Sequence, residues 1–232
     1  MIKKNSIKIS KLIKYYNFIN HNFMYDNKPI NRYKNSDKLL KLKKLYSALS
    51  NIKNCELKKS ATNLVFSDGN PNAKVMLIGE GPGSNEDKEG LPFVGRAGQL
   101  LDKMLLSIKL NRRNVYITNV VNYRPPQNRR PTEIEIKRYY PFLVKHIEII
   151  NPKILVLLGS TALNAIIGDS EVISKARGKW KKLKIGNCNT DVICSFHPAF
   201  LMRQPEQKKY AWVDLKMIKK KLLEFNIKIE KK

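Results

Sequence analysis

Residues that could bind a ligand follow four short apolar runs, each of which has the length of a buried strand. The runs are 75–78, 115–118, 154–158 and 192–196, and directly after them stand Gly79-Glu80-Gly81-Pro82-Gly83, Asn119, Gly159-Ser160 and His197-Pro198. Carboxylate and imidazole groups can move protons, and an amide can pair with a polar ligand. Because the carboxyl ends of parallel strands line one edge of a sheet, we expect these residues to converge there.

Each of these residues also has a structural interpretation when it is taken alone. The glycine turn reads GxGxG with Pro82 inside it, and no GK[ST] follows, so it does not match a dinucleotide or nucleotide fingerprint. Its glycines instead indicate close approach of the backbone to a ligand. Asn119 could bond to the local backbone, His197 could be a structural histidine, and Phe93 could be ordinary core. Their convergence is stronger evidence than any one of them.

The segments between the apolar runs have helical spacing. Helices are expected at 97–108, from the capping-box signature Thr132-Glu133-Ile134-Glu135 to about Ile150, from Ser160 or Thr161 to Gly168, and over the region of Trp212 to Phe225. Alternating strands and helices predict an α/β fold with a mostly parallel sheet and right-handed crossovers.

Both ends of the chain differ from this pattern. Residues 1–50 are predicted to be a basic N-terminal extension with one helix over 38–49, residues 51–225 the main domain, and 226–232 a basic tail. No apolar run reaches the ~18 residues of a membrane span. The start lacks the apolar region of a secretory signal, so a cytoplasmic location is expected, although an organelle transit peptide is not excluded.

Charge and cysteine content indicate the class of partner and the compartment. A formal net charge of +26 favours a polyanionic partner. Much of it could also reflect coding bias, since the chain is rich in Lys, Asn and Ile. The three cysteines, Cys55, Cys188 and Cys194, form no CxxC pair, which is typical of free thiols in a reducing compartment.

Three segments in order resemble the motifs of family-4 uracil-DNA glycosylases. The first runs from Gly79-Glu80-Gly81-Pro82-Gly83 through Glu86-Asp87 to Gly90-Leu91-Pro92-Phe93-Val94-Gly95-Arg96-Ala97-Gly98-Gln99. The second is Tyr116-Ile117-Thr118-Asn119 with Arg124-Pro125-Pro126, Asn128-Arg129 and Pro131-Thr132, and the third is His197-Pro198-Ala199 with Leu201 and Arg203. The resemblance covers about Cys55 to Leu215. Two further segments are similar to the alphaproteobacterial branch, namely Cys55-Glu56-Leu57-Lys58 and Arg177-Gly178-Lys179-Trp180.

The resemblance implies a three-layer α/β/α fold around a four-stranded parallel sheet. It also implies hydrolysis of the N-glycosidic bond of uracil in DNA, which leaves an abasic site in base excision repair. The expected partner is uracil-containing DNA, single- or double-stranded, and the expected state is a monomer associated with the nucleoid. The target base must leave the stack before it can react.

The resemblance also implies roles for individual residues. Phe93 supplies a stacking face, the Asn119 amide pairs with the uracil edge, and Gly81 and Gly83 lie against the base. His197 stabilises the leaving uracil anion. Glu80 is the candidate for water activation, and Glu86 and Asp87 are further candidates that could instead cap the turn.

DNA contacts are expected beyond the base pocket. Leu201, or alternatively Met202, is expected to enter the minor groove as an apolar wedge. Arg203, Arg129 and Arg130 are expected to contact phosphates.

The chain departs from the family at the iron–sulfur ligands. A [4Fe–4S] cluster needs four cysteines. Of the four ligand positions, only Cys55 carries a thiol, and the others are Ile52, Tyr123 and Tyr139. We therefore expect no cluster, no other metal and no cofactor.

Two other classes of protein are weighed against the glycosylase. One is a DNA-binding module with a decayed glycosylase site, which the presence of Phe93, Asn119 and His197 disfavours. The other is a phosphate- or dinucleotide-binding enzyme, which Pro82 and the missing GK[ST] disfavour. A base-crosslinking relative would carry a basic insertion after Pro126 that is absent here.

Overall fold

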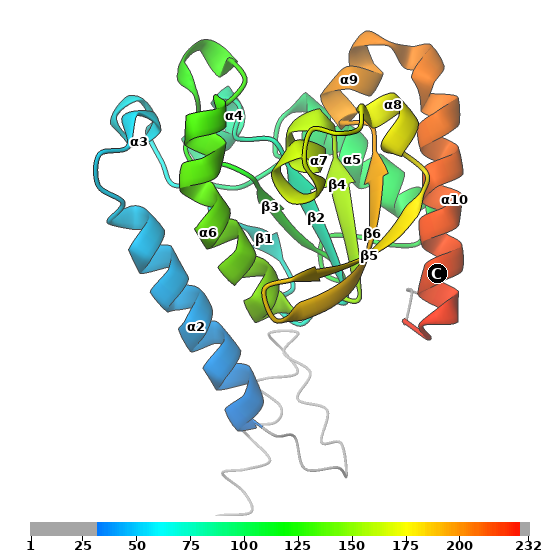
Figure 1. The fold of residues 1–232 in the computed structure, drawn as a ribbon, viewed down its shortest axis with the longest axis horizontal. Helices are drawn as coiled ribbons and strands as arrows, with labels where there is room; N and C mark the ends of the chain where they lie inside the picture. Colours follow the sequence, from blue (N-terminus) through cyan, green and yellow to red (C-terminus); the bar gives the residue numbers. More distant parts are fainter. Residues whose placement is uncertain (1–31, 228–232) are drawn as a thin grey trace, which may run out of the picture. The chain divides into compact units, whose positions relative to one another are not determined.

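The computed structural model describes residues 32–227, and its centre is a six-stranded sheet (Figure 1). The strand order is β1-β3-β2-β4-β6-β5. The strands are β1 (Asp68–Gly69), β2 (Val75–Gly79), β3 (Tyr116–Asn119), β4 (Ile154–Leu158), β5 (Trp180–Ile185) and β6 (Cys188–Ser195). The four expected strands are the central ones and are mutually parallel. The antiparallel edge strands β1 and β5 were not expected.

The edge strands lack the signal that marks a buried strand. β1 has only two residues. β5 carries Lys181, Lys182 and Lys184, and most of its side chains are exposed or partly exposed. Lysine on an edge strand protects the sheet from pairing with other chains. The sheet is therefore wider than the four-stranded one implied by the motifs, but its parallel centre is the same.

Helices cover the sheet, and the expected ones begin and end within six residues of the predicted ranges, while several short helices were not expected. They are α2 (Arg32–Ser50), α3 (Glu56–Ser60), α4 (Ser84–Glu89), α5 (Arg96–Ser107), α6 (Glu133–Ile150), α7 (Ser160–Ile167), α8 (Ile173–Ala176), α9 (Pro198–Arg203) and α10 (Lys208–Glu224), with 3-10 turns η1 (Pro126–Asn128) and η2 (Pro205–Gln207). The capping box is present, since Thr132 accepts from the Glu135 N–H. No helix within residues 32–227 combines the length and apolar character needed to cross a bilayer.

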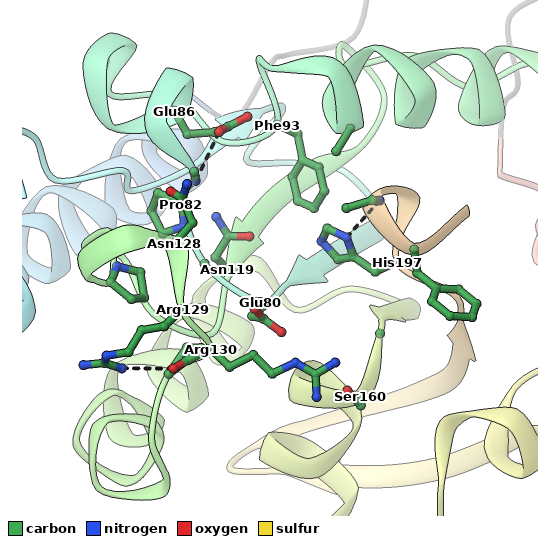
Figure 2. A pocket seen from close by; sticks show the side chains of 18 of the residues that line it. Glu80, Pro82, Glu86, Phe93, Asn119, Asn128, Arg129, Arg130, Ser160 and His197 are labelled. Carbon is green, nitrogen blue, oxygen red and sulfur yellow. Dashed lines mark hydrogen bonds between the residues drawn. The ribbon is translucent and has the colours of Figure 1, made fainter. Parts of the chain in front are cut away.

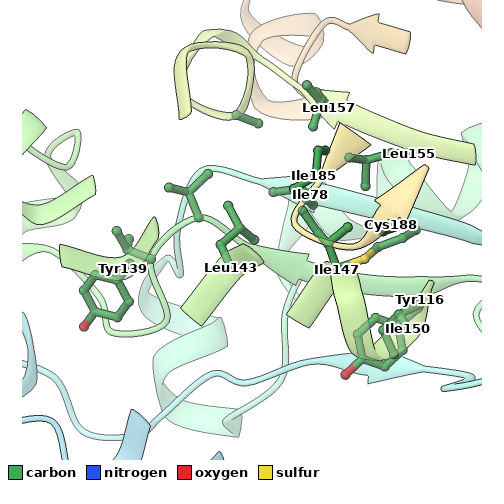
Figure 3. Packing of buried hydrophobic residues seen from close by; sticks show 14 of the residues in the cluster. Ile78, Tyr116, Tyr139, Leu143, Ile147, Ile150, Leu155, Leu157, Ile185 and Cys188 are labelled. Atoms are coloured by element: carbon green, nitrogen blue, oxygen red, sulfur yellow. The ribbon is translucent and has the colours of Figure 1, made fainter. Parts of the chain in front are cut away.

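The two faces of the sheet bury separate apolar clusters because side chains alternate along each strand. On β2, Met76 and Ile78 pack with α6 and α7 in one cluster, part of which Figure 3 shows. Val75 and Leu77 pack with α5 and α10 in the other. Helices on both faces of a mostly parallel sheet make the predicted three-layer α/β/α fold.

The helix expected in the N-terminal extension belongs to the main unit instead. The compact unit begins at Asp37, and Leu42, Leu45 and Leu49 are buried in the same cluster as α6. The Lys38 Nζ donates to the carbonyl of Ile150 at 3.1 Å, at the end of α6. The predicted boundary after residue 50 is therefore too late. The expectations for residues 1–31 and for the tail at 228–232 lie outside the described residues.

Candidate active site

A cleft of about 410 Å³ opens at the carboxyl ends of the parallel strands (Figure 2). The segments that follow β2, β3, β4 and β6 all line it, as the strand-end pattern predicted. All the predicted site residues except Leu201 are found there, namely Glu80, Gly81, Gly83, Phe93, Asn119, Arg129, Arg130, His197 and Arg203.

The Asn119 amide lies at the base of the cleft. Asn119 ends β3 beside Gly79 of β2 and is 3% exposed. A Cβ at Gly79 would lie 2.5 Å from both the Asn119 Oδ1 and the Phe93 Cζ, so only glycine leaves room for both groups. Within residues 32–227 the amide makes no hydrogen bond. An amide that lines a cleft without a protein partner is available to pair with a ligand there.

Phe93 and His197 face each other beside this amide, and in Figure 2 all three side chains point toward one space. The two ring centroids are 5.5 Å apart and the ring planes are inclined by 30°. Phe93 is buried, and its ring joins the apolar cluster that contains Leu101 and Leu105 of α5. The arrangement provides a flat apolar surface next to a hydrogen-bonding edge.

His197 is held as a neutral hydrogen-bond donor. It caps the N-terminus of α9, where its Nδ1 accepts from the Ala199 N–H at 3.2 Å. The proton of the neutral ring is therefore on Nε2. Burial, and then the charge of Arg203, lower the pKa of His197 to about 4. Gly159, whose φ is +92°, lets the β4–α7 turn lie against the histidine side chain.

The lowered pKa predicts the acid dependence of the site. The pKa of His197 is about 4 in the folded chain and 6.5 in the unfolded chain, so the unfolded chain binds the proton first as the pH falls. The free energy of unfolding therefore decreases as the pH falls from 6.5 to about 4. Above pH 6.5 the ring is neutral in both states. We expect the acid limb of the reaction rate to lie near pH 4. A single-turnover pH profile tests this, and a limb near pH 6.5 that His197→Asn removes would contradict it.

Of the three carboxylates of the first motif, Glu80 and Glu86 line the cleft, and Glu86 and Asp87 accept from backbone N–H groups. The Glu80 Oε2 accepts from the Thr161 hydroxyl of α7, and Glu80 lines the cleft. Glu86 accepts from the N–H groups of Gly83 and Gly95, at 3.1 and 2.8 Å. Asp87 is buried and accepts from the N–H groups of residues 62 and 63. Glu80 is thus the carboxylate of this motif that lines the cleft without capping a turn.

The arginines at the rim are not equivalent. Arg129 forms a two-point ion pair with Glu135, at 2.8 and 2.6 Å. Arg130 and Arg203 have no carboxylate partner among residues 32–227, and both line the cleft. No carboxylate of the described residues therefore neutralises these two guanidinium groups at the rim.

Leu201 does not have the position that a wedge requires. It is 1% exposed and packs in the apolar cluster with α5 and α10. The six-residue helix α9 turns this side inward, and the burial of Leu201 does not suit the wedge that was predicted for it. The neighbouring Phe200 is partly exposed, lies 4.9 Å from Phe196 between ring centroids, and lines the cleft. Phe200 follows His197, the N-cap of α9, by three residues, and this spacing could have identified it.

The four positions that correspond to iron–sulfur ligands pack as part of the core. Cys55, Tyr123 and Tyr139 are buried in one cluster, against which Ile52 packs. The Cys55 Sγ lies 3.2 Å from the Tyr139 hydroxyl. Burial raises the pKa of Tyr139, so its phenol stays protonated. No group of three or more metal-binding side chains occurs in the part of the chain that the structure describes. These donors do not fit a [4Fe–4S] cluster.

Comparisons with known proteins agree with the motifs and the geometry. The family model described as the uracil DNA glycosylase superfamily matches residues 66–216. A type-4 uracil-DNA glycosylase of Archaeoglobus fulgidus is 40% identical over 71% of this chain and 84% of its own length. Those of Sulfurisphaera tokodaii and Thermotoga maritima are 42% and 45% identical, over 77% and 64% of this chain and 83% and 77% of their own lengths. The chain belongs to the uracil DNA glycosylase superfamily and resembles its type-4 members most clearly.

Proposed function

We propose that the protein hydrolyses the N-glycosidic bond of uracil in DNA and leaves an abasic site, as the first step of base excision repair. The observation that carries this proposal is the nearly buried Asn119 amide, which has no partner within residues 32–227 and faces the cleft beside Phe93 and His197. The type-4 uracil-DNA glycosylases similar to this chain support the same substrate.

The amide suits the edge of uracil better than that of cytosine. Uracil presents an N3–H donor and an O4 acceptor, which pair with the oxygen and the nitrogen of one planar amide. Cytosine reverses this pattern, and each mismatched buried group costs about 1–3 kcal/mol. A Cβ on Gly83 would lie 2.8 Å from the Glu86 Oε2. We infer that the Glu86 carboxylate limits the room beside the base.

Bond cleavage develops negative charge on uracil and positive charge on the sugar. The Nε2–H of neutral His197 is a donor that can stabilise the uracil oxygen, because Nδ1 already accepts from Ala199. A neutral donor does this without the cost of burying an extra charge. We assign the backbone N–H groups around Gly81 a supporting role.

Glu80 is the residue that we assign to the water molecule. Replacing it with glutamine keeps its shape but removes the negative charge that attracts a proton and faces the cationic sugar. We expect uracil release to slow by about 10- to 100-fold, which is at or below the lower end of the rate effects of general bases. The loss is this small because stabilisation of the leaving uracil anion reduces the need for a strong base. Single-turnover kinetics of Glu80→Gln measure this. Glu89→Gln, an exposed charge-matched change on α4, is the control. Equal rates for the two variants would remove Glu80 from the mechanism.

DNA binding is assigned to the rim of the cleft. Arg130 and Arg203 are proposed to contact phosphates, with a smaller contribution from Arg129, because Glu135 already neutralises it. Phe200 takes the place of Leu201 as the apolar side chain beside the unstacked bases. We propose that the protein acts as a monomer on single- and double-stranded DNA.

We also propose that the protein works without an iron–sulfur cluster. The contact between Cys55 and Tyr139 and the packing of Tyr123 support this. Purified protein is expected to contain no stoichiometric iron and no visible absorption band, and to keep its full rate in chelator. Cys55→Ser is expected to leave the spectrum unchanged. Four irons per chain after anaerobic purification, with a visible band that Cys55→Ser abolishes, would contradict the proposal.

The function is tested with oligonucleotides that carry one uracil, thymine or cytosine at the same position. Alkali cleavage after incubation reports abasic sites. We expect cleavage at uracil alone, in both single strands and U·G duplexes. Cleavage at none of the bases, with DNA still bound, would favour a binding module with a decayed site.

A further inference from the structure

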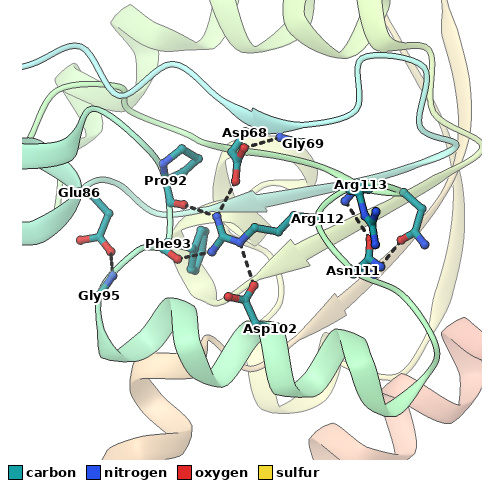
Figure 4. Close-up of polar contacts among 11 residues, drawn as sticks. Asp68, Gly69, Glu86, Pro92, Phe93, Gly95, Asp102, Asn111, Arg112 and Arg113 are labelled. Atoms are coloured by element: carbon teal, nitrogen blue, oxygen red, sulfur yellow. Dashed lines mark hydrogen bonds and ion pairs between the residues drawn. The ribbon is translucent and has the colours of Figure 1, made fainter. Parts of the chain in front are cut away.

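The guanidinium group of Arg112 binds the loop that carries Phe93, from outside the cleft (Figure 4). Arg112 lies in the turn before β3. Its Nη1 donates to the carbonyl of Pro92 at 3.1 Å, and its Nη2 donates to the carbonyl of Phe93. Arg112 does not line the cleft, so it can act on a bound base only through the loop.

This loop has a backbone conformation that needs support. Phe93 has a φ of +56°, in the left-handed region that bulky residues rarely adopt. Such a conformation persists only where surrounding contacts over-determine it. The two carbonyls that accept from Arg112 flank the Phe93 N–Cα and Cα–C bonds, so they fix the torsions that aim the ring.

Two carboxylates hold the guanidinium group in turn. Its Nη1 lies 2.6 Å from the Asp68 Oδ2 of β1, and its Nε lies 2.9 Å from the Asp102 Oδ1 of α5. The Arg112 side chain is 26% exposed, so these contacts are only partly screened by solvent. The planar fork of arginine supplies donors in fixed directions to four oxygens, which a single ammonium group cannot reproduce.

The loop is also closely confined by two glycines. A Cβ at Gly98 of α5 would lie 1.7 Å from the Phe93 carbonyl oxygen, and a Cβ at Gly79 would lie 2.5 Å from the ring. The Phe93 carbonyl therefore packs against the backbone of α5, and the Phe93 ring packs against the backbone of β2. Arg112 adds hydrogen bonds to the carbonyls of Pro92 and Phe93.

We propose that Arg112 is a positioning residue, which fixes Phe93 at the distance and tilt needed to stack on the flipped base. This inference rests on the proposed function, since it assigns Phe93 the stacking role. It adds a residue that does not touch the substrate. A displacement of a positioned group by about 1 Å can cost on the order of 100-fold in rate.

A double-mutant cycle tests the proposal with single-turnover uracil release. We expect Arg112→Gln to slow release about 10- to 100-fold in the wild-type background. In the Phe93→Ala background, the same change is expected to slow release by less than about threefold, because the ring that it positions is gone. An equal loss in both backgrounds, or no loss in either, would overturn the positioning role. No release by wild-type protein would instead overturn the proposed function.

Two further variants separate positioning from general stability. Arg138→Gln also removes an arginine–carbonyl bond, to Lys53 at 3.0 Å, but on α6 away from the loop. It is expected to change the rate less than about twofold. If Arg112→Gln does not fold, Asp102→Asn replaces it, since it weakens the support of Arg112 while leaving both carbonyl bonds. We expect a loss of about 2- to 5-fold that Phe93→Ala again suppresses, and an unsuppressed loss counts against the proposal.

A readout without substrate is hydrogen exchange of the backbone amides of residues 93–98. Arg112→Gln is expected to speed exchange in this segment, including the Gly95 N–H that donates to Glu86. Exchange in β4 is expected to stay unchanged. Faster exchange throughout the protein would show a loss of global stability and would count against the positioning role, and unchanged exchange in 93–98 would show that Arg112 does not hold the loop.

Discussion

Replacing His197 with alanine is expected to slow uracil release about 100- to 1,000-fold, which is typical of losing one donor to a developing anion. The Nε2–H is the donor that the geometry offers, because the Nδ1 is engaged by Ala199. Binding of uracil-free DNA is expected to change little, since phosphate contacts remain. Single-turnover rates with saturating enzyme, together with binding isotherms, measure both quantities.

His146 provides the matched control. It is 2% exposed, lies 2.7 Å from the Tyr116 hydroxyl through Nε2, and stacks on Phe66 away from the cleft. His146→Gln is expected to lower the melting temperature but to leave the rate of the folded enzyme within about twofold. Comparable rate losses for the two histidine variants would mean that His197 acts through stability and not on the leaving group.

Replacing Asn119 with alanine is expected to slow release by about 100-fold or more, because two hydrogen bonds to a buried base edge are lost. Asn119→Asp is expected to be equally impaired. Its carboxylate can accept from uracil N3–H but has no donor for O4, and the charge would be nearly buried. Rates for uracil in single- and double-stranded DNA measure the loss.

The control for this prediction lies three residues further along the chain. Asn122 is also buried, but its amide donates to the carbonyls of Val65 and Phe66, at 3.0 and 3.3 Å. Asn122→Ala is expected to destabilise the fold without a comparable loss of rate. A fast Asn119→Ala enzyme would refute base recognition by this amide.

The parts of the fold that the sequence predicts are those with strong local signals. The central strands are continuous apolar runs because both of their faces are buried, and the capping box marks the start of α6. β5 could not be predicted in this way because its lysines suit an exposed edge strand, and whether a strand lies at the edge depends on which other strands pair with it. The first turn of α2 looks polar, and only tertiary packing of Leu42, Leu45 and Leu49 shows that the helix joins the domain.

In the candidate site too, some residues could be predicted from the sequence and others depend on tertiary packing. Strand ends place Glu80, Asn119 and His197 in one cleft, and topology alone predicts that convergence. Leu201 was assigned by position in a motif, but the phase of α9 turns it inward and leaves Phe200 on the cleft. Arg112 and Thr161 carried no recognisable signal, because their partners Phe93 and Glu80 are distant in sequence.

The most direct test of the central claim is uracil release by the wild-type protein from a labelled oligonucleotide with a single uracil, in the presence of a chelator. DNA binding is measured in the same samples. We expect rapid release and a full complement of abasic sites under these conditions. Bound DNA without release, from both single- and double-stranded substrate, would contradict it.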